Sequence, residues 1–165
     1  MGAMAAVVSK KNENVIPKVA LMLLKLMRRG ADAHGIASPN QVIVAKSIKE
    51  LKGERIVSNT ALGHNLSRIL QRDCPQPVQG EGFSLVFEGR LFPPSVGPDA
   101  NEFLTGLGSD LMKSVERDAE ELDGSFVFAV ALPGRGRVEA TSPNRILKTT
   151  TELIFTWKVN LRGLC

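Results

Sequence analysis

The chain has 165 residues, of which 43% are hydrophobic and 23% are charged, an ordinary composition for a globular protein that predicts one domain over residues 1–165. No apolar run reaches the roughly 18–20 residues of a membrane span, and the N-terminus lacks a secretory signal pattern, so we expect a cytoplasmic protein and no membrane partner. Two cysteines far apart, Cys74 and Cys165, and only two histidines argue against a disulfide framework and a zinc site.

The net charge of +4 hides an asymmetry between the two halves of the chain. Residues 1–72 carry twelve Lys and Arg against four Asp and Glu, whereas residues 73–165 carry nine against thirteen. A basic half attracts nucleic acid or an acidic partner, but the two halves can equally attract each other or a second copy of the chain. With no Tyr and one Trp, the basic stretches lack aromatic residues for base stacking, so nucleic acid is the less favoured partner.

The N-terminal part of the chain predicts a strand, a helix and three further strands. The apolar run Ala5–Val8 predicts a buried strand. Apolar residues at helical spacing from Ile16 to Met27 predict an amphipathic helix, with Asn14 as its cap and Gly30 as its end. Short strands are predicted over Gly35–Ser38, Gln41–Lys46 and Arg55–Asn59.

The C-terminal part predicts a second helix among further strands. Phe83–Phe87 predicts a strand that Glu88-Gly89-Arg90 ends, and Asp99 predicts the cap of a helix whose apolar face runs from Phe103 to Val115. The continuous apolar run Ser125–Leu132 predicts a strand covered on both faces. The last predicted strands are Arg137–Thr141, in a hairpin, and Glu152–Val159. Hairpins between most strands predict an α+β fold with antiparallel sheets.

Short segments in order along the chain resemble one known family. They are Arg28–Ile36, Gly63-His64-Asn65-Leu66-Ser67, Asp73 with Gln76-Pro77, Leu85–Phe92 and Leu122–Ala129. Together they resemble the glutaminase domain of class II glutamine amidotransferases, and most closely that of asparagine synthetases. The resemblance implies the fold of N-terminal nucleophile hydrolases, a four-layer αββα sandwich with antiparallel sheets. We expect no metal and no cofactor.

The resemblance also locates the chemistry and shows where it is missing. Glutaminases of this family attack the glutamine amide with an N-terminal Cys, and they stabilise the oxyanion with an Asn side chain and the N–H of the next Gly. The match places Gly2 at the nucleophile and Glu88 at the oxyanion Asn, while Gly89 keeps its N–H. Gly2 has no side chain and a carboxylate repels an oxyanion, so we assign no catalytic residue.

The remaining residues of the expected vestigial pocket also come from the resemblance. They are His64 and Asn65, Arg68 in place of an Arg that holds the substrate carboxylate, and Asp99 in place of the Asp that holds its amino group. Apart from the resemblance, we expect His64 to be a structural histidine and not a catalytic base. Glutamine or a related amino acid is the ligand that such a pocket implies.

Three functions follow from these observations. The preferred one is a binding or assembly module without glutaminase activity, whose partner is a synthetase, a second copy of the chain or a small amide or amino acid. The second is an active amidotransferase subunit that supplies ammonia to a synthetase such as asparagine synthetase, with Cys74 as the only internal candidate nucleophile. The third is nucleic-acid binding through the basic N-terminal half.

Overall fold

The computed structural model describes residues 2–51, 56–92, 96–107, 114, 117, 121–133, 137–139 and 156–159. The helices are α1 (Ile16–Lys25), the 3-10 helix η1 (Met27–Arg29), α2 (Ile48–Leu51) and α3 (Asp99–Gly106). The strands are β1 (Ala3–Val8), β2 (Ala33–Ser38), β3 (Gln41–Ala45), β4 (Thr60–Leu66), β5 (Val78–Gly80), β6 (Phe83–Phe92), β7 (Asp123–Leu132), β8 (Arg137–Glu139) and β9 (Thr156–Val159).

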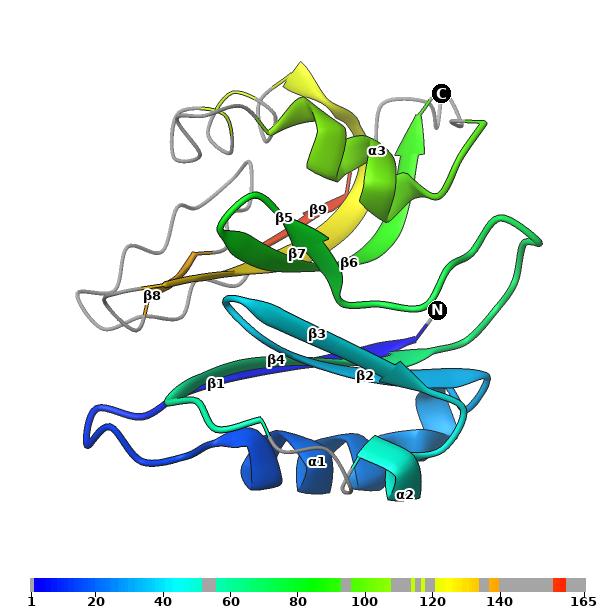
Figure 1. Ribbon diagram of the computed structural model, residues 1–165. Helices are drawn as coiled ribbons and strands as arrows, with labels where there is room; N and C mark the ends of the chain where they lie inside the picture. The colour runs from blue at the N-terminus through cyan, green and yellow to red at the C-terminus, as the bar shows by residue number, and fades with distance from the viewer. Residues whose placement is uncertain are drawn as a thin grey trace.

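Two antiparallel sheets lie face to face between helices (Figure 1). The first sheet has the strand order β1-β4-β2-β3, and α1 and α2 cover its outer face. The second has the order β5-β6-β7-β8, with β9 also paired to β7, and α3 covers its outer face. The described part of the chain is therefore an α+β sandwich with αββα layers, and the predicted fold class is confirmed.

Apolar residues fill the spaces between the layers. Val19 and Leu23 of α1 pack on Ile36 and Ala61 of the first sheet. Between the sheets four of the six residues in the buried cluster are alanines, Ala129 among them. Small side chains let the two sheets approach closely.

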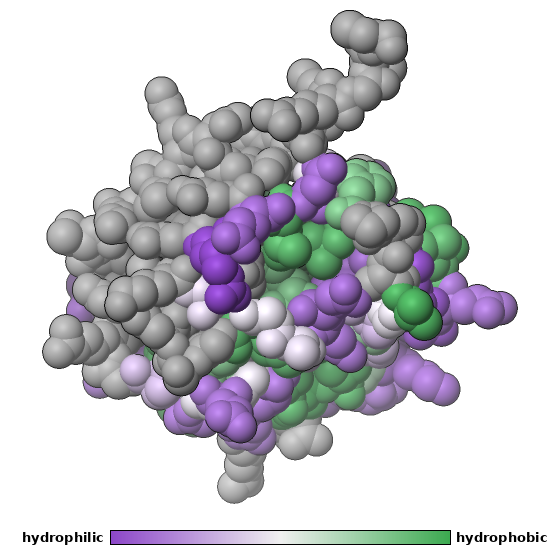
Figure 2. Space-filling model, turned by 90° about the horizontal axis from the view of Figure 1, so that it is seen from above, coloured by the Kyte–Doolittle hydropathy of each residue, from purple (hydrophilic) through white to green (hydrophobic). Residues whose placement is uncertain are grey.

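Aromatic residues form the layer between α3 and the second sheet. Phe103 of α3 lies against Phe87 of β6 and Phe126 and Phe128 of β7, with ring centroids 4.4 to 6.0 Å from its own. Figure 2 shows the molecule from the side on which α3 lies. On the described part of that surface, hydrophilic residues border the hydrophobic ones. The Phe cluster fixes α3, and through it Asp99, against the sheet.

The prediction that Glu88-Gly89-Arg90 ends a strand is wrong. β6 continues through these residues to Phe92, and Glu88 to Phe92 pair with Val127 to Asp123 of β7. Backbone pairing to a neighbouring strand satisfies the N–H and C=O groups here, which outweighs the poor strand propensity of the charged residues. The longer strand is what carries Glu88 and Arg90 to the edge of the sandwich.

The predicted strand over Arg55–Asn59 is also wrong for the part that the structure describes. Residues 56–59 are irregular, and the strand β4 begins at Thr60. The Ser58 N–H donates to Asn14 Oδ1 and the Ser58 carbonyl accepts from the Val15 N–H, so this segment bonds to the start of α1 instead of a strand. Asn14 also accepts a hydrogen bond from the Ile16 N–H, although Val15 is the N-cap residue by geometry.

Both long helices end earlier than predicted. The α-helix α1 ends at Lys25, and the 3-10 turn η1 leads to Gly30. The helix α3 ends at Gly106, since Leu107 has an extended backbone conformation, and the residues of the predicted face after Leu107 lie outside the described residues. The predicted strand segments 140–141 and 152–155 also lie outside them.

Candidate functional site

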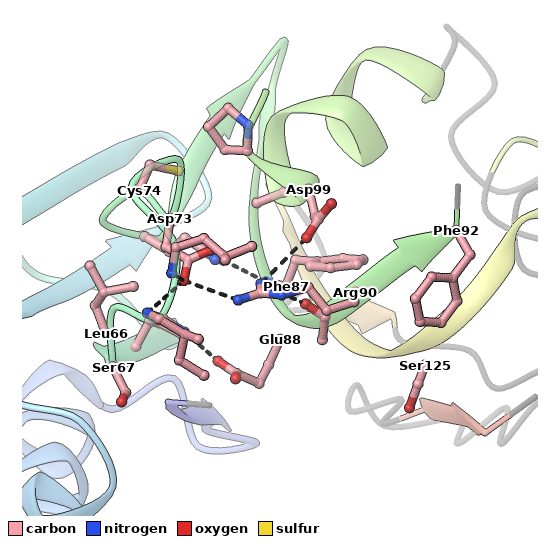
Figure 3. A pocket seen from close by; sticks show the side chains of 17 residues that line it. Leu66, Ser67, Asp73, Cys74, Phe87, Glu88, Arg90, Phe92, Asp99 and Ser125 are labelled. Carbon is pink, nitrogen blue, oxygen red and sulfur yellow. Dashed lines mark hydrogen bonds and ion pairs between the residues drawn. The ribbon is translucent and has the colours of Figure 1, made fainter. Parts of the chain in front are cut away.

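A cavity of about 310 Å³ opens at one edge of the sandwich, where β4, the loop after it, β6 and the start of α3 meet (Figure 3). Its walls combine apolar side chains, such as Leu66 and Phe87, with a dense group of polar ones. The ionisable residues that line it are His64, Asp73, Cys74, Glu88, Arg90 and Asp99. A cavity of this size and character is suited to a small polar ligand.

Glu88 connects the two sheets at one wall of this cavity. Its Oε1 accepts a hydrogen bond of 2.7 Å from the Gly2 N–H, and its Oε2 lies 3.0 Å from His64 Nε2. The His64 side chain is 1% exposed and that of Glu88 is 19% exposed. Because a carboxylate only accepts, His64 donates through Nε2, and its buried Nδ1 has no hydrogen-bond partner among the described residues.

Burial and hydrogen bonding act in opposite directions on the Glu88 carboxyl. Burial alone raises its pKa, but the hydrogen bonds from His64 and from the Gly2 N–H outweigh burial and hold the pKa below its ordinary value. Glu88 is therefore ionised at neutral pH. It places a negative charge where the resemblance to glutaminases requires a neutral Asn amide.

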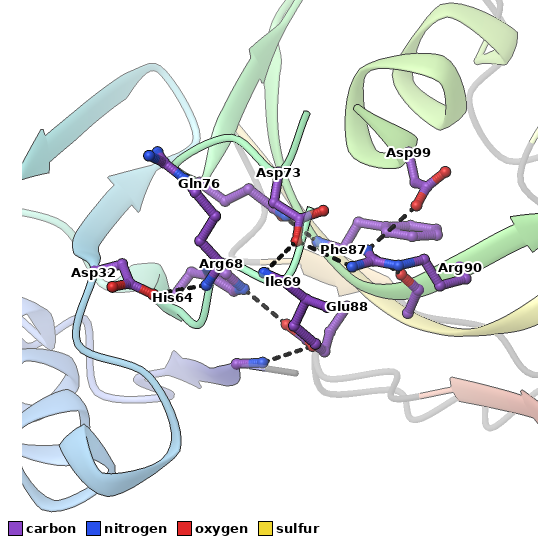
Figure 4. Close-up of polar contacts among 12 residues, drawn as sticks. Asp32, His64, Arg68, Ile69, Asp73, Gln76, Phe87, Glu88, Arg90 and Asp99 are labelled. Atoms are coloured by element: carbon purple, nitrogen blue, oxygen red, sulfur yellow. Dashed lines mark hydrogen bonds and ion pairs between the residues drawn. The ribbon is translucent and has the colours of Figure 1, made fainter. Parts of the chain in front are cut away.

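Arg90, two residues after Glu88 on β6, lies between two carboxylates (Figure 4). Its guanidinium donates to Asp73 Oδ2 at 3.0 Å and to Asp99 Oδ2 at 3.4 Å. Asp73 Oδ2 also accepts hydrogen bonds from the Ile69 and Leu70 N–H groups. Burial raises the pKa of Asp73, yet these backbone donors and Arg90 together lower it below its ordinary value. Arg90, Asp73 and Asp99 thus form a network of charged groups joined by hydrogen bonds.

The structure brings together some of the predicted site residues and separates others. His64, Glu88, Gly89 and Asp99 line the cavity. Gly2 lies behind Glu88, next to Asn65, whose carbonyl oxygen a Cβ on Gly2 would strike. Asn65 is buried under α1, where its amide accepts from His34 Nδ1 and donates to the Leu23 carbonyl. Arg68 is exposed and does not line the cavity; its N–H donates to Asp32.

Sequence reasoning missed Arg90 as a site residue and treated Asp73 only as part of the framework. Arg90 stands two positions after Glu88, so on a continuous strand both side chains share one face. That alternation is a usable signal, but it disappears if the strand is thought to end at Glu88. Asp73 and Asp99 are distant from Arg90 in the sequence, and only the fold brings them together.

Cys74 lines the cavity but is poorly placed as a nucleophile. Burial raises the pKa of its thiol above the ordinary value, and the neighbouring Asp73 charge acts in the same direction. A thiol with a raised pKa carries little thiolate at neutral pH, and thiolate is the reactive form.

In the described ranges there is no group of three or more His, Cys, Asp and Glu side chains that could hold a metal ion.

No family model and no curated protein matches this sequence. Among solved structures, the chain is similar to glutamine phosphoribosylpyrophosphate amidotransferase from B. subtilis in complex with ADP and GMP, with a TM-score of 0.61 and 16% sequence identity. The match covers 80% of this chain and 35% of that one, so this chain spans about a third of the other's length. At this identity the likeness shows the fold alone. That fold agrees with the predicted αββα sandwich, while membership of the glutamine amidotransferases and the closer tie to asparagine synthetases stay predictions.

None of the helices in the described ranges is long and apolar enough to cross a membrane.

Replacing Glu88 by Gln tests the Glu88 hydrogen bonds through their pH dependence. A carboxyl whose pKa is lowered by folding stabilises the fold above its unfolded-state pKa of about 4.3, and this contribution is lost as the pH falls through the folded-state pKa. We expect Glu88→Gln to lower the free energy of unfolding by about 1–2 kcal/mol at pH 7 and by much less at pH 3. Urea unfolding at a series of pH values measures this. The control is Glu81→Gln, an exposed site outside the cavity lining, and equal pH profiles for the two variants would contradict the assignment.

Proposed function

We propose that this chain is a glutaminase-type domain that does not hydrolyse glutamine and that serves as a binding domain through its cavity. The observation that carries the proposal is the position of Glu88. Both of its oxygens are engaged by other parts of the fold, by the Gly2 N–H and by His64. A site for acyl transfer instead requires a nucleophile and neutral donors directed at a developing oxyanion.

The surroundings of Gly2 support the loss of the nucleophile. A Cβ at this position would overlap the Asn65 carbonyl oxygen and would lie 3.0 Å from Glu88 Oε2. The backbone just before β1 is therefore fitted to a glycine, and a cysteine side chain has no room without movement of β4. Gly89 has a φ of +139°, so its N–H is held in a conformation that few other residues adopt, but the adjacent negative charge opposes an oxyanion there.

The chemistry of Cys74 argues against the alternative, in which the chain is an active amidotransferase subunit with Cys74 as its nucleophile. An active subunit that used Cys74 would need a base to generate the thiolate. Of the two neighbouring charges that act on this thiol, that of Asp73 has the larger effect and raises the pKa, while that of Arg68 lowers it. The lining of the cavity thus favours binding over covalent catalysis.

The test measures glutamate release by the purified protein incubated with glutamine. We expect no release above a protein-free blank, under conditions in which glutamine phosphoribosylpyrophosphate amidotransferase, as the positive control, produces glutamate. Release that rises in proportion to the amount of protein would overturn the proposal. If that release were lost in Cys74→Ala and kept in Glu88→Gln, the nucleophile would be Cys74.

A further inference from the structure

We infer that the ligand of this cavity is a small organic amine, bound as an ammonium ion and lacking a carboxylate. The inference rests on the proposed function as a binding domain, and it names the class of molecule that the site takes. Three features of the cavity lead to it. Its walls carry more carboxylates than cations, the one guanidinium among its described lining residues already donates to two carboxylates, and part of its surface is apolar.

The charge of the walls favours a cation. Among the described residues that line the cavity there are three carboxylates, Asp73, Glu88 and Asp99, and one guanidinium, Arg90. Two of the carboxylates, on Asp73 and Glu88, have pKa values below the ordinary range and are charged at neutral pH. A cavity partly shielded from water strengthens the attraction of such groups for an ammonium ion.

The same walls disfavour a ligand carboxylate. Arg90 is the lining group that could bind one, but its guanidinium already donates to Asp73 and Asp99. Arg68, the residue in place of a carboxylate-binding Arg, is exposed and lies outside the lining. An amino acid would therefore bring its carboxylate into a negative site, whereas the corresponding amine would not.

The rest of the cavity suits the other end of such a molecule. Leu66, Ile69 and Phe87 provide apolar wall for a short alkyl chain. Ser67 and Ser125 also line it, and their hydroxyls can pair with a polar group at that end of the ligand.

The test is a matched pair of ligands measured by isothermal titration calorimetry at neutral pH. Glutamine and 4-aminobutanamide share the side-chain amide and the amino group, and they differ in the α-carboxylate. We expect 4-aminobutanamide to bind at least tenfold more tightly than glutamine. Tighter or equal binding of glutamine would overturn the inference, and so would the absence of binding by 4-aminobutanamide at millimolar concentration.

Two charge-removing variants locate the site. Glu88→Gln and Asp99→Asn are each expected to weaken 4-aminobutanamide binding about tenfold, and Glu81→Gln, which removes a charge outside the cavity, is expected to leave it unchanged. Thermal unfolding of each variant separates lost binding from lost structure, and Glu88→Gln still decides the result if Asp99→Asn fails to fold. Equal affinities in Glu88→Gln and Glu81→Gln would place the ligand elsewhere and overturn the inference.

The result also separates this inference from the proposed function. If glutamine binds more tightly than the amine and no glutamate appears in the calorimeter cell, only the ligand class is wrong. If glutamate appears in proportion to protein, the proposed function itself is wrong.

Discussion

Replacing Phe128 by alanine is expected to lower the free energy of unfolding by about 3–5 kcal/mol. Phe128 is fully buried at the centre of the layer between α3 and the second sheet, and its ring centroid lies 4.4 Å from that of Phe103. Alanine would leave a void that the neighbouring rings of Phe103 and Phe126 can fill only in part. Urea unfolding followed by circular dichroism measures the loss.

The control for this prediction is Phe92→Ala in the adjacent strand β6. Phe92 is 50% exposed, so truncating its ring removes little buried area, and we expect a loss below about 1 kcal/mol. Similar losses for the two variants would show that the Phe cluster does not hold α3 on the sheet. Because α3 begins with Asp99, a loosened α3 should also weaken 4-aminobutanamide binding in Phe128→Ala.

The layers of the fold were accessible from the sequence because they depend on local patterns. The helical spacing from Ile16 to Met27 and the apolar run Ser125–Leu132 each identify an element and the face that it buries. In both cases the structure shows the expected type of element with somewhat different ends. Local patterns of this kind are strong where the element packs on one core, since burial then dominates over the preferences of single residues.

The candidate site was less accessible because it depends on register and on distant pairs. The register of β1 on β4 pairs Ala3 with Asn65, and this alone sets Gly2 against the Asn65 carbonyl. The Arg90 network likewise needs the loop carrying Asp73 and the start of α3 to converge on β6. A sequence indicates which residues are charged, but it does not indicate which of them will share one edge of a sandwich.

The differences within β6 have a common physical origin. Charged residues in the middle of an apolar strand look like its end, because ionised side chains are rarely buried. Here Glu88 and Arg90 face a cavity and are paired with His64, Asp73 and Asp99, so the strand continues through them. The place where the sequence pattern fails is thus the place where the cavity lies, as is common at functional sites.

Replacing Gly35 by alanine is expected to destabilise the fold by about 3 kcal/mol, the upper part of the range for overpacked sites. Gly35 lies in β2 between His64 of β4 and Val44 of β3, and a Cβ there would strike the carbonyl oxygen of Gln76 and lie 2.7 Å from Cδ of Pro77. These are backbone and ring atoms that cannot rotate away. Urea unfolding measures the loss of stability.

Gly35→Ala should also disturb the cavity, because Gln76 is one of the residues that line it. The Phe87 N–H donates to Gln76 Oε1 at 2.6 Å, and a displaced Gln76 would lose this hydrogen bond and shift the loop that carries Asp73. We therefore expect Gly35→Ala, where it folds, to bind 4-aminobutanamide more weakly. Gly97→Ala is the matched control, since a Cβ on Gly97 meets no atom within 4 Å, and its stability should stay within about 0.5 kcal/mol of the parent. Unchanged stability in Gly35→Ala would mean that β2 and the Gln76 loop do not pack as closely as the fold of the cavity requires.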